Sequence, residues 1–315
     1  MVVTDDKGGL ELSSVYPEFY VVGAPKCGTT ALCKYLSFHP NIFIPGRKEL
    51  HFFGSDLNYH WRVKTANEYL KFFESADKSQ IRGDGSVWHL FSKFAADEIY
   101  SARPDAKIII MLRNPVDLLY SLHSTYLLNG YESVKNFYKL IKILEKREEV
   151  GHPPRKNTSA YGLVYKGAAH YSQQIPKFLS KFGESNVKVI LYEDFKSRTE
   201  EVLYETHRFL GVESCNSGPL TPANQSRRWR SLRYHWFAED PPDWAAKAVG
   251  CLTLEGRPTF AGRYLIRKLD SKFNLDVNPR KPLDEEFRAY LARYFEQDIK
   301  YVETLTNRDL GAWRR

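Results

Sequence analysis

Short apolar runs alternate with segments of helical spacing over the first two-thirds of the chain. Three runs rich in β-branched and aromatic residues predict buried strands, at residues 18–23, 106–112 and 186–192. Apolar residues three or four positions apart predict helices, which begin at Pro115 and cover residues 29–38, 66–76, 92–102, 132–148 and 166–182. This alternation indicates β-α-β units, so we expect an α/β fold with a parallel sheet flanked by helices.

The pattern changes near residue 212, where a loop-like stretch replaces the alternation. A basic, tryptophan-rich run follows at Arg227–Trp236, and residues 284–306 again have helical spacing. No internal repeat or low-complexity linker separates two domains. After a loose lead-in at residues 1–16, we expect a single domain over residues 17–315, with an α/β core and a mostly helical C-terminal portion at residues 17–211 and 212–315.

The composition is that of a globular protein. Of 315 residues, 43% are hydrophobic and 27% are charged, which excludes a disordered chain and a collagen-like repeat. Apolar runs such as Ile108–Leu112 are far shorter than the roughly 20 residues of a membrane-spanning helix, and no signal peptide is visible. The four cysteines form no disulfide framework, so we expect a reducing compartment and a cytoplasmic location.

The net charge adds a hint about the partner of the protein. Lysine and arginine number 46 against 38 acidic residues, for a net charge of +8. Such an excess suggests an anionic partner, which is a nucleic acid, an acidic membrane surface or a phosphorylated small molecule. A surface that only improves solubility is the alternative.

The loop at residues 23–30 follows the first strand and precedes the first helix. Backbone N–H groups of such a loop and the positive end of the helix form a site for phosphate. Gly23 and Gly28 have P-loop spacing, but the lysine is at position 26 rather than after the second glycine. No apolar strand predicted from the sequence ends in an aspartate that would hold Mg²⁺, because the strand at 106–112 is followed by Arg113. The loop is therefore P-loop-like without the metal ligand of an ATP-hydrolysing enzyme, or it is simply a tight strand–helix turn.

Residues 25–30 (PKCGTT) resemble the 5′-phosphosulfate loop of sulfotransferases that use 3′-phosphoadenosine-5′-phosphosulfate (PAPS). Residues 36–42 and 48–53 are similar to the L-x-x-H-P and K-E-x-x-F-F runs of the carbohydrate and bacterial branch. Residues 308–313 resemble the terminal signature of bacterial members. The resemblance runs from about residue 17 to the C-terminus and implies the sulfotransferase fold and activity.

The resemblance also implies roles for the loop residues. Lys26 would contact the oxygen that bridges sulfur and phosphorus and support departure of the 5′-phosphate. Backbone amides near Cys27 and Gly28, with Thr29 and Thr30, would hold that phosphate. The positive end of the helix could lower the pKa of the Cys27 thiol, but we expect this side chain to fill space, with a catalytic cysteine as the minor alternative.

A second pair would hold the other end of the nucleotide. Arg113 follows the strand at 106–112, and Ser121 lies eight residues later, as in the family's 3′-phosphate motif. A guanidinium is a fixed donor fork that suits phosphate. The resemblance thus implies PAPS as co-substrate and 3′,5′-adenosine bisphosphate (PAP) as product, with no metal.

The acceptor needs a general base, and the resemblance assigns this role to Glu49. The alternative for Glu49 is an ion pair with Lys48 or Arg47. His51 and His89 are further candidates, because histidine transfers protons near neutral pH.

The acceptor itself is not readable from the sequence. Gly85 replaces a lysine of heparan-type members, and Val87 replaces a proline, which disfavours a polysaccharide. We expect a small molecule, a natural product or a carrier-bound group that presents a hydroxyl or an amine. The sequence makes no prediction of the oligomeric state.

Two other functions remain open: a P-loop nucleotide kinase or NTPase, and a basic nucleic-acid-binding module. The second depends on the arginines at positions 227, 228 and 230. Closure over the nucleotide and a solvated face are the alternatives for these three residues. Gly151–Ser159 predicts an exposed loop, either an acceptor flap or an ordinary connection. With the phosphate motifs in place, nucleic acid is the minor alternative.

Overall fold

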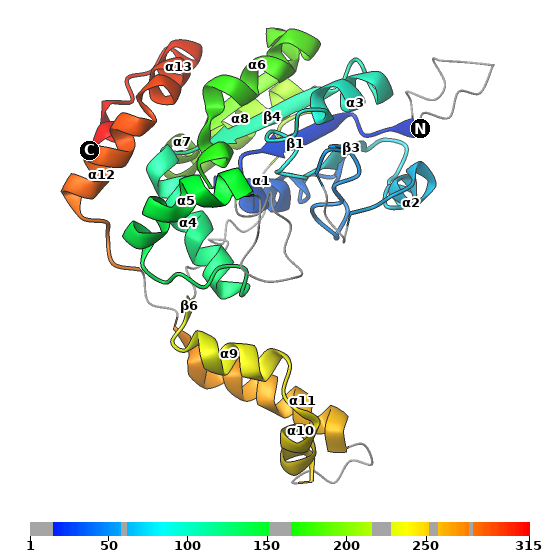
Figure 1. The fold of residues 1–315 in the computed structure, drawn as a ribbon. Coiled ribbons are helices and arrows are strands. Elements are labelled where there is room, and N and C mark those ends of the chain that lie inside the picture. The colour runs from blue at the N-terminus through cyan, green and yellow to red at the C-terminus, as the bar shows by residue number, and fades with distance from the viewer. Residues whose placement is uncertain (1–14, 58–61, 151–164, 216–227, 252–257, 277–279) are drawn as a thin grey trace. The chain divides into compact units, whose positions relative to one another are not determined.

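A computed structural model describes residues 15–57, 62–150, 165–215, 228–251, 258–276 and 280–315 (Figure 1). Its centre is a sheet of five strands in the order β2-β3-β1-β4-β5, and every neighbouring pair is parallel. The strands are β1 Phe19–Gly23, β2 Ile42–Phe43, β3 Ile81–Asp84, β4 Lys107–Leu112 and β5 Val187–Leu191. The predicted α/β fold is confirmed.

The three strands that the sequence predicts are the apolar ones. Residues of β1 and β4 are almost completely buried, because helices cover both faces of a parallel sheet. The polar strand β3 is held by its pairing with β1, in which Gly83 lies opposite Phe19. A Cβ atom at Gly83 would lie 2.1–2.5 Å from the Phe19 ring, so only glycine leaves room for this core side chain.

Helices cover the two faces of the sheet (Figure 1). On one face α1 (Thr29–Leu36) packs with α8 (Thr199–Leu210), and on the other α3 (Ala95–Ala102) packs with α6 (Tyr171–Phe182). Each presents an apolar stripe to the sheet, as amphipathic helices do. Helix α8 ends at Gly211, whose φ of 79° is the left-handed value that favours glycine at a helix end.

The remaining helices complete the chain. They are α2 Ala66–Lys71, α4 Pro115–Leu128, α5 Phe137–Val150, α7 Tyr192–Ser197, α9 Leu232–Glu239, α10 Asp243–Gly250, α11 Pro258–Leu269, α12 Glu285–Tyr294 and α13 Glu296–Thr306. The single helical pattern at 284–306 is thus two helices, divided at the buried Phe295. None of the helices that the structure describes is both long and apolar enough to cross a membrane.

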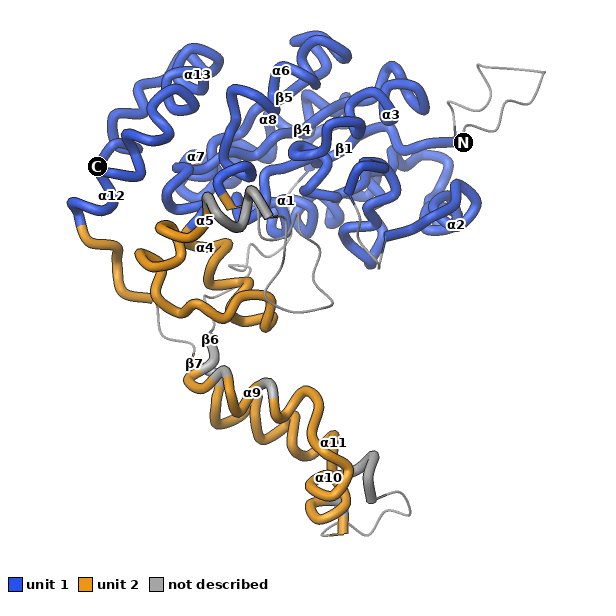
Figure 2. The backbone as a smooth tube through the Cα atoms, in the orientation of Figure 1, with its two compact units in different colours: residues 1–119, 166–223, 285–315 blue, residues 120–165, 224–284 orange. Residues whose placement is uncertain are grey.

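The chain forms two compact units (Figure 2). The first comprises residues 1–119, 166–223 and 285–315, and the second comprises residues 120–165 and 224–284. The second unit is mostly helical, and the His235 imidazole, the Asp270 carboxylate and the Asn274 amide form a buried hydrogen-bonded group within it. The helical C-terminal portion is therefore observed, whereas the sequence-based division at residue 212 stays a prediction. The predicted loop at 151–159 lies outside the described residues.

Candidate active site

Chemistry-bearing residues of the first unit follow the carboxyl ends of the parallel strands. The loop at 23–28 follows β1, Asp84–Ser86 closes β3, Arg113 follows β4 and Tyr192 follows β5. Ligands of open α/β sheets bind at this edge because parallel strands all end there. The predicted phosphate loop and Arg113 are therefore at the edge where such sheets bind ligands.

Two glycines shape the loop after β1. A Cβ atom at Gly23 would lie 2.5 Å from the Leu90 Cβ atom, so the backbone is too close to its neighbour for a side chain. Gly28 has φ of 88° and lies against the Tyr192 ring, which a Cβ atom would meet at 3.1 Å. Helix α1 begins at this residue with no side-chain cap. Its first amides therefore face the loop without a capping side chain, as a phosphate site requires.

Cys27 fills space in this loop. Its side chain is fully buried, and its Sγ atom lies 3.5 Å from the Pro25 carbonyl oxygen. Burial raises the pKa of the thiol to about 12. The side chain is therefore a neutral thiol at physiological pH and not a nucleophile, which agrees with the expected spacer role.

Lys26 belongs to a cluster of charges. Burial lowers the pKa of its ammonium, and so do the charges of Lys48 and Arg113, whereas the Glu49 carboxylate opposes them. Three cations and one carboxylate thus act on one another at the end of β1. An excess of positive charge in a partly buried place is what an anionic ligand would neutralise.

Lys48 joins the loop to the predicted base. Its Nζ atom donates to the hydroxyl oxygens of Thr30 at 2.8 Å and Thr29 at 3.2 Å. The same Nζ atom lies 3.9 Å from a carboxylate oxygen of Glu49. The ion pair considered as an alternative for Glu49 is therefore present, and it lies within the site.

Glu49 also pairs with His51. The Glu49 carboxylate lies 3.5 Å from the His51 Nε2 atom, and the His51 side chain is almost fully buried. Burial pushes the Glu49 pKa upward, but the hydrogen bond from His51 and the charges of Lys48, His51 and Lys26 hold the pKa below its usual range. Glu49 is therefore an ionised carboxylate at neutral pH, ready to accept a proton.

A buried hydrogen-bonded chain supports this pair. The His51 backbone N–H donates to the Ser86 hydroxyl at 3.0 Å, and that hydroxyl donates to Asp84 at 2.7 Å. The Tyr69 hydroxyl donates to the second Asp84 oxygen at 2.8 Å. Burial raises the pKa of Asp84. The carboxylate therefore depends on these donors, and the chain connects the end of β3 to the backbone of His51.

The His89 imidazole is also fully buried, with its ring centre 6.2 Å from that of His51. Burial, followed by the charges of His51 and Arg62, lowers the pKa of His89 well below its usual value. His89 is therefore neutral near pH 7, and it stays a candidate base without a contact to Glu49 among the described residues.

The Arg113 guanidinium is held by its neighbours and keeps one buried donor without a partner among the described residues. It lies over the Tyr192 ring at 4.7 Å and 3.8 Å from an oxygen of Asp117. Its Nε atom is buried and has no hydrogen-bond partner among the residues that the structure describes. A buried donor of this kind calls for a partner. Tyr192, which the sequence analysis did not single out, could have been found by its position at the end of a predicted strand.

The remaining candidates lie in the second unit or outside the described residues. Ser121 lies on α4 in the second unit, so its pairing with Arg113 stays a prediction. Arg228 belongs to β6 (Arg228–Trp229) and pairs there with β7 (Leu275–Asp276), and the Arg230 backbone N–H donates to Asn274. Arg227 lies outside the described residues.

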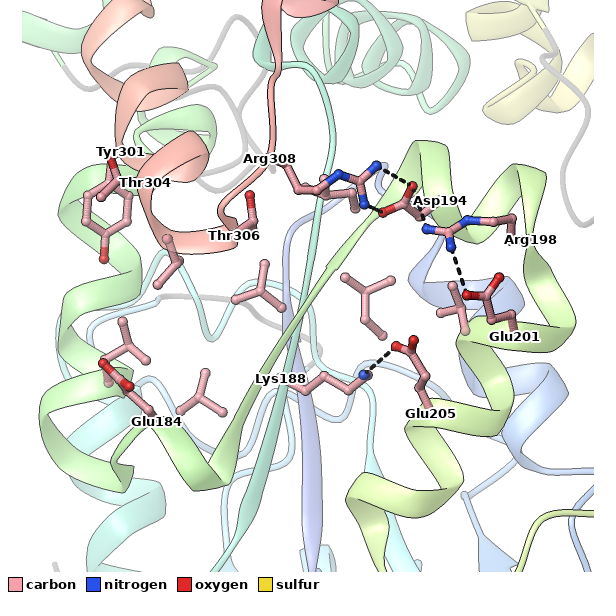
Figure 3. A pocket seen from close by; sticks show the side chains of 17 residues that line it. Glu184, Lys188, Asp194, Arg198, Glu201, Glu205, Tyr301, Thr304, Thr306 and Arg308 are labelled. Carbon is pink, nitrogen blue, oxygen red and sulfur yellow. Dashed lines mark hydrogen bonds and ion pairs between the residues drawn. The ribbon is translucent and has the colours of Figure 1, made fainter.

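A groove runs along β5, the edge strand of the sheet (Figure 3). None of the sequence-predicted site residues is among the described residues that line it. Six of its seven charged side chains, all except Glu184, pair with one another, namely Lys188 with Glu205 at 3.0 Å, Arg308 with Asp194 at 2.9 Å and Arg198 with Glu201 at 2.8 Å. Because these charges are compensated within the groove, it is not the candidate anion site.

Comparison with known proteins shows which family the chain belongs to. The sulfotransferase domain family matches residues 17–233. The bifunctional heparan sulfate N-deacetylase/N-sulfotransferase 4 of Mus musculus is 28% identical over 95% of this chain and 31% of its own length. The membrane-associated sulfotransferase kil1 of Dictyostelium discoideum is 24% identical over 93% of this chain and 66% of its own length.

The chain thus spans less than two-thirds of the length of these relatives. A solved sulfotransferase from Alicyclobacillus acidocaldarius is similar over nearly the whole of both chains, with 95% of this chain and 99% of the other covered. The two share 28% identity and a TM-score of 0.68. The chain belongs to the sulfotransferase family.

Proposed function

We propose that this protein transfers a sulfuryl group from PAPS to a hydroxyl or amine of an acceptor. The observation that carries the proposal is the meeting of the phosphate loop and the Glu49–His51 pair through Lys48. A sulfuryl transferase needs a cationic site for the leaving phosphate next to a base for the acceptor. This cluster supplies both.

The residues present fit the nucleotide. PAPS carries a phosphosulfate at one end and a 3′-phosphate at the other, and when bound it supplies the activated sulfuryl group. The loop of Lys26, Gly28, Thr29 and Thr30 suits the first end, because it combines uncapped helix amides, hydroxyls and cations. Arg113, with its buried unpaired Nε atom, suits the second.

The residues act in the following roles. Glu49 accepts the proton of the acceptor as it attacks the sulfur in line with the leaving oxygen. His51 holds the Glu49 carboxylate in place through the contact at 3.5 Å. Lys26 offsets the negative charge that develops on the departing 5′-phosphate, which is the largest electrostatic demand of such a transfer.

For the acceptor we propose a small molecule or a carrier-bound group. Gly85 and Val87 support this choice because they depart from the heparan-type pattern. Some relatives have names that refer to heparan sulfate or to carbohydrate. Oligosaccharides are therefore the acceptors against which small molecules should be compared in the transfer assay. A cytoplasmic location belongs to this same proposal.

Calorimetry with three ligands tests the donor. We expect PAP to bind, and ATP with Mg²⁺ and a short DNA duplex to bind much more weakly or not at all. Lys26→Ala should nearly abolish transfer of sulfate from PAPS to a panel of phenols, alcohols, amines and oligosaccharides. Binding of only ATP or only the duplex would instead favour a nucleotide kinase or a nucleic-acid-binding protein.

A further inference from the structure

Lys48 contacts three polar groups that the proposed reaction uses. Its Nζ atom donates to the hydroxyl oxygens of Thr29 and Thr30 and lies 3.9 Å from Glu49. Its side chain is only 20% exposed, so the ammonium is held within the site rather than extended into solvent.

The direction of these hydrogen bonds determines what the threonines can do. An ammonium has three donors and no acceptor, so each threonine oxygen must accept from Lys48. The proton of each hydroxyl is then directed to another acceptor. Because both hydroxyls lie at the start of α1, an anion at the amides of that helix is the acceptor that they would meet.

The path of the Lys48 side chain depends on Gly85. A Cβ atom at Gly85 would lie 3.4 Å from the Lys48 Cε atom and 3.6 Å from its Cγ atom. It would also lie 2.8 Å from the Cys33 Sγ atom, which belongs to α1. The side chain of Lys48 therefore passes closely over a position without a side chain and reaches the two threonines.

We propose that Lys48 is a positioning residue of the phosphosulfate site, which turns the Thr29 and Thr30 hydroxyls into donors toward the 5′-phosphate and ties that site to Glu49. This inference rests on the proposed function. It adds a cation that acts through its neighbours, whereas Lys26 acts on the leaving group itself.

The first test removes the Lys48 charge and keeps most of its length. We expect Lys48→Met to weaken PAP binding about tenfold or more, as loss of charge-assisted hydrogen bonds does, and to lower kcat with PAPS. Lys71→Met is the matched control, because it removes an exposed lysine from α2. The control should bind PAP as the wild type does.

The second test is the pH profile of kcat/KM, which reports the free enzyme and which a purely structural role would not move. The charge of Lys48 helps to hold the Glu49 pKa down. In Lys48→Met the acid limb should therefore move to higher pH, and in Lys48→Arg, which keeps the charge, it should stay near the wild-type position. An unchanged acid limb in Lys48→Met, or the same shift in both variants, overturns the link to Glu49.

The third test asks whether Lys48 acts through a hydroxyl. Thr30→Val replaces the exposed threonine by a residue of the same shape. In a double-mutant cycle with Lys48→Met, the double variant should lose less PAP binding free energy than the two single variants lose together, because both substitutions remove the same interaction. Additive losses overturn the orienting role.

These outcomes are separate from failure of the proposed function. If the wild type binds no PAP and transfers no sulfate, the function is wrong. If the wild type binds PAP and Lys26→Ala abolishes transfer, but Lys48→Met keeps wild-type affinity and pH profile, the function stands and the role of Lys48 is wrong.

Discussion

Left-handed backbone marks the residues of the candidate active site. Among the described residues, four that are not glycine have positive φ, at Lys26, Glu49, His51 and Asn307. Asn307 ends α13, where such a conformation is common, but the other three carry the proposed chemistry. Each costs roughly 1–3 kcal/mol and persists only where the surroundings hold it. The strain therefore supports the view that these side chains are positioned for function.

Replacement of the Glu49 carboxylate tests the base. Glu49→Gln keeps the size of the side chain but accepts no proton, so kcat should fall by about 10²–10⁴ while PAP still binds. Glu68→Gln, on the exposed surface of α2, is the matched control for a lost carboxylate. Full activity of Glu49→Gln would move the base to His51 or His89.

The same residue predicts the pH dependence of the wild type. A general base must be ionised to accept a proton. Partial burial raises the Glu49 pKa, but the His51 hydrogen bond and the charges of Lys48, His51 and Lys26 hold it below its usual range. The pH profile of kcat/KM reports the free enzyme, so it should show no acid limb above the usual pKa range of glutamate. Rate measurements at low donor and acceptor concentrations between pH 8 and 4 check this. An acid limb near pH 6 would instead indicate a histidine.

Arg113 should affect donor binding more than chemistry. Arg113→Ala should weaken PAP binding about tenfold or more, with a smaller change in kcat at saturating PAPS. Arg113→Lys should restore little, because an ammonium lacks the planar fork that lies over the Tyr192 ring. Arg293→Ala, an exposed position of α12, is the control. Equal PAP affinity in Arg113→Ala and Arg293→Ala would contradict the assignment.

At the scale of elements, the end of β3 supports the segment that carries Glu49 and His51. Asp84 and Ser86 follow directly from the strand, and Ser86 accepts the backbone N–H of His51. Tyr69 of α2 donates to the same Asp84 carboxylate. A strand end, a helix and a loop are thus joined by side chains that are buried from solvent, and the position of His51 depends on all three.

Loss of the Ser86 hydroxyl should destabilise the contact between the end of β3 and the segment of His51. Ser86→Ala leaves the His51 amide and one Asp84 oxygen without their partner, which should lower the free energy of unfolding by about 1–3 kcal/mol. It should also lower kcat, because Glu49 depends on His51. Ser101→Ala removes an exposed hydroxyl that bonds within α3 and should cost about 0.5 kcal/mol or less. Urea unfolding of both variants measures the difference, and equal costs would contradict a supporting role.

The elements also show what a sequence can reveal. β4 was predictable because a central parallel strand is a continuous apolar run. β2 and β3 were not, because two and four residues carry too little pattern and their pairing with neighbours defines them. The resemblance of the motifs to the family predicted that Lys26 and Glu49 belong to one site. The contacts of Lys48 and the stacking of Arg113 on Tyr192 depend on the approach of distant segments, which no local pattern contains.

At the scale of the whole chain, the last residues return to the sheet within the first unit. The Asn114 side chain, next to Arg113, donates to the Trp313 carbonyl oxygen at 3.0 Å, and Trp313 is buried. Arg314 then binds Glu296 and Glu303 of α13. The C-terminal residues that resemble the family's terminal signature therefore contact the segment that follows β4, next to Arg113.

The ion pair of Arg314 with Glu303 predicts how stability depends on pH. The hydrogen bond from Arg314 lowers the pKa of Glu303 to about 2, against about 4.3 in the unfolded chain. A carboxylate whose pKa is lower in the folded state contributes stability that is full above about pH 4.3 and is lost as the pH falls toward 2. Glu303→Gln should therefore be less stable than the wild type near pH 6, and the difference should shrink steadily below pH 4.

Urea unfolding at several pH values between 6 and 2.5 measures this difference. Glu285→Gln, an exposed carboxylate at the start of α12, is the control and should follow the wild type throughout. The Glu303 side chain is 23% exposed, so solvent screens the pair and the effect should be modest. A difference that stays constant with pH would mean that Glu303 acts by packing rather than by charge.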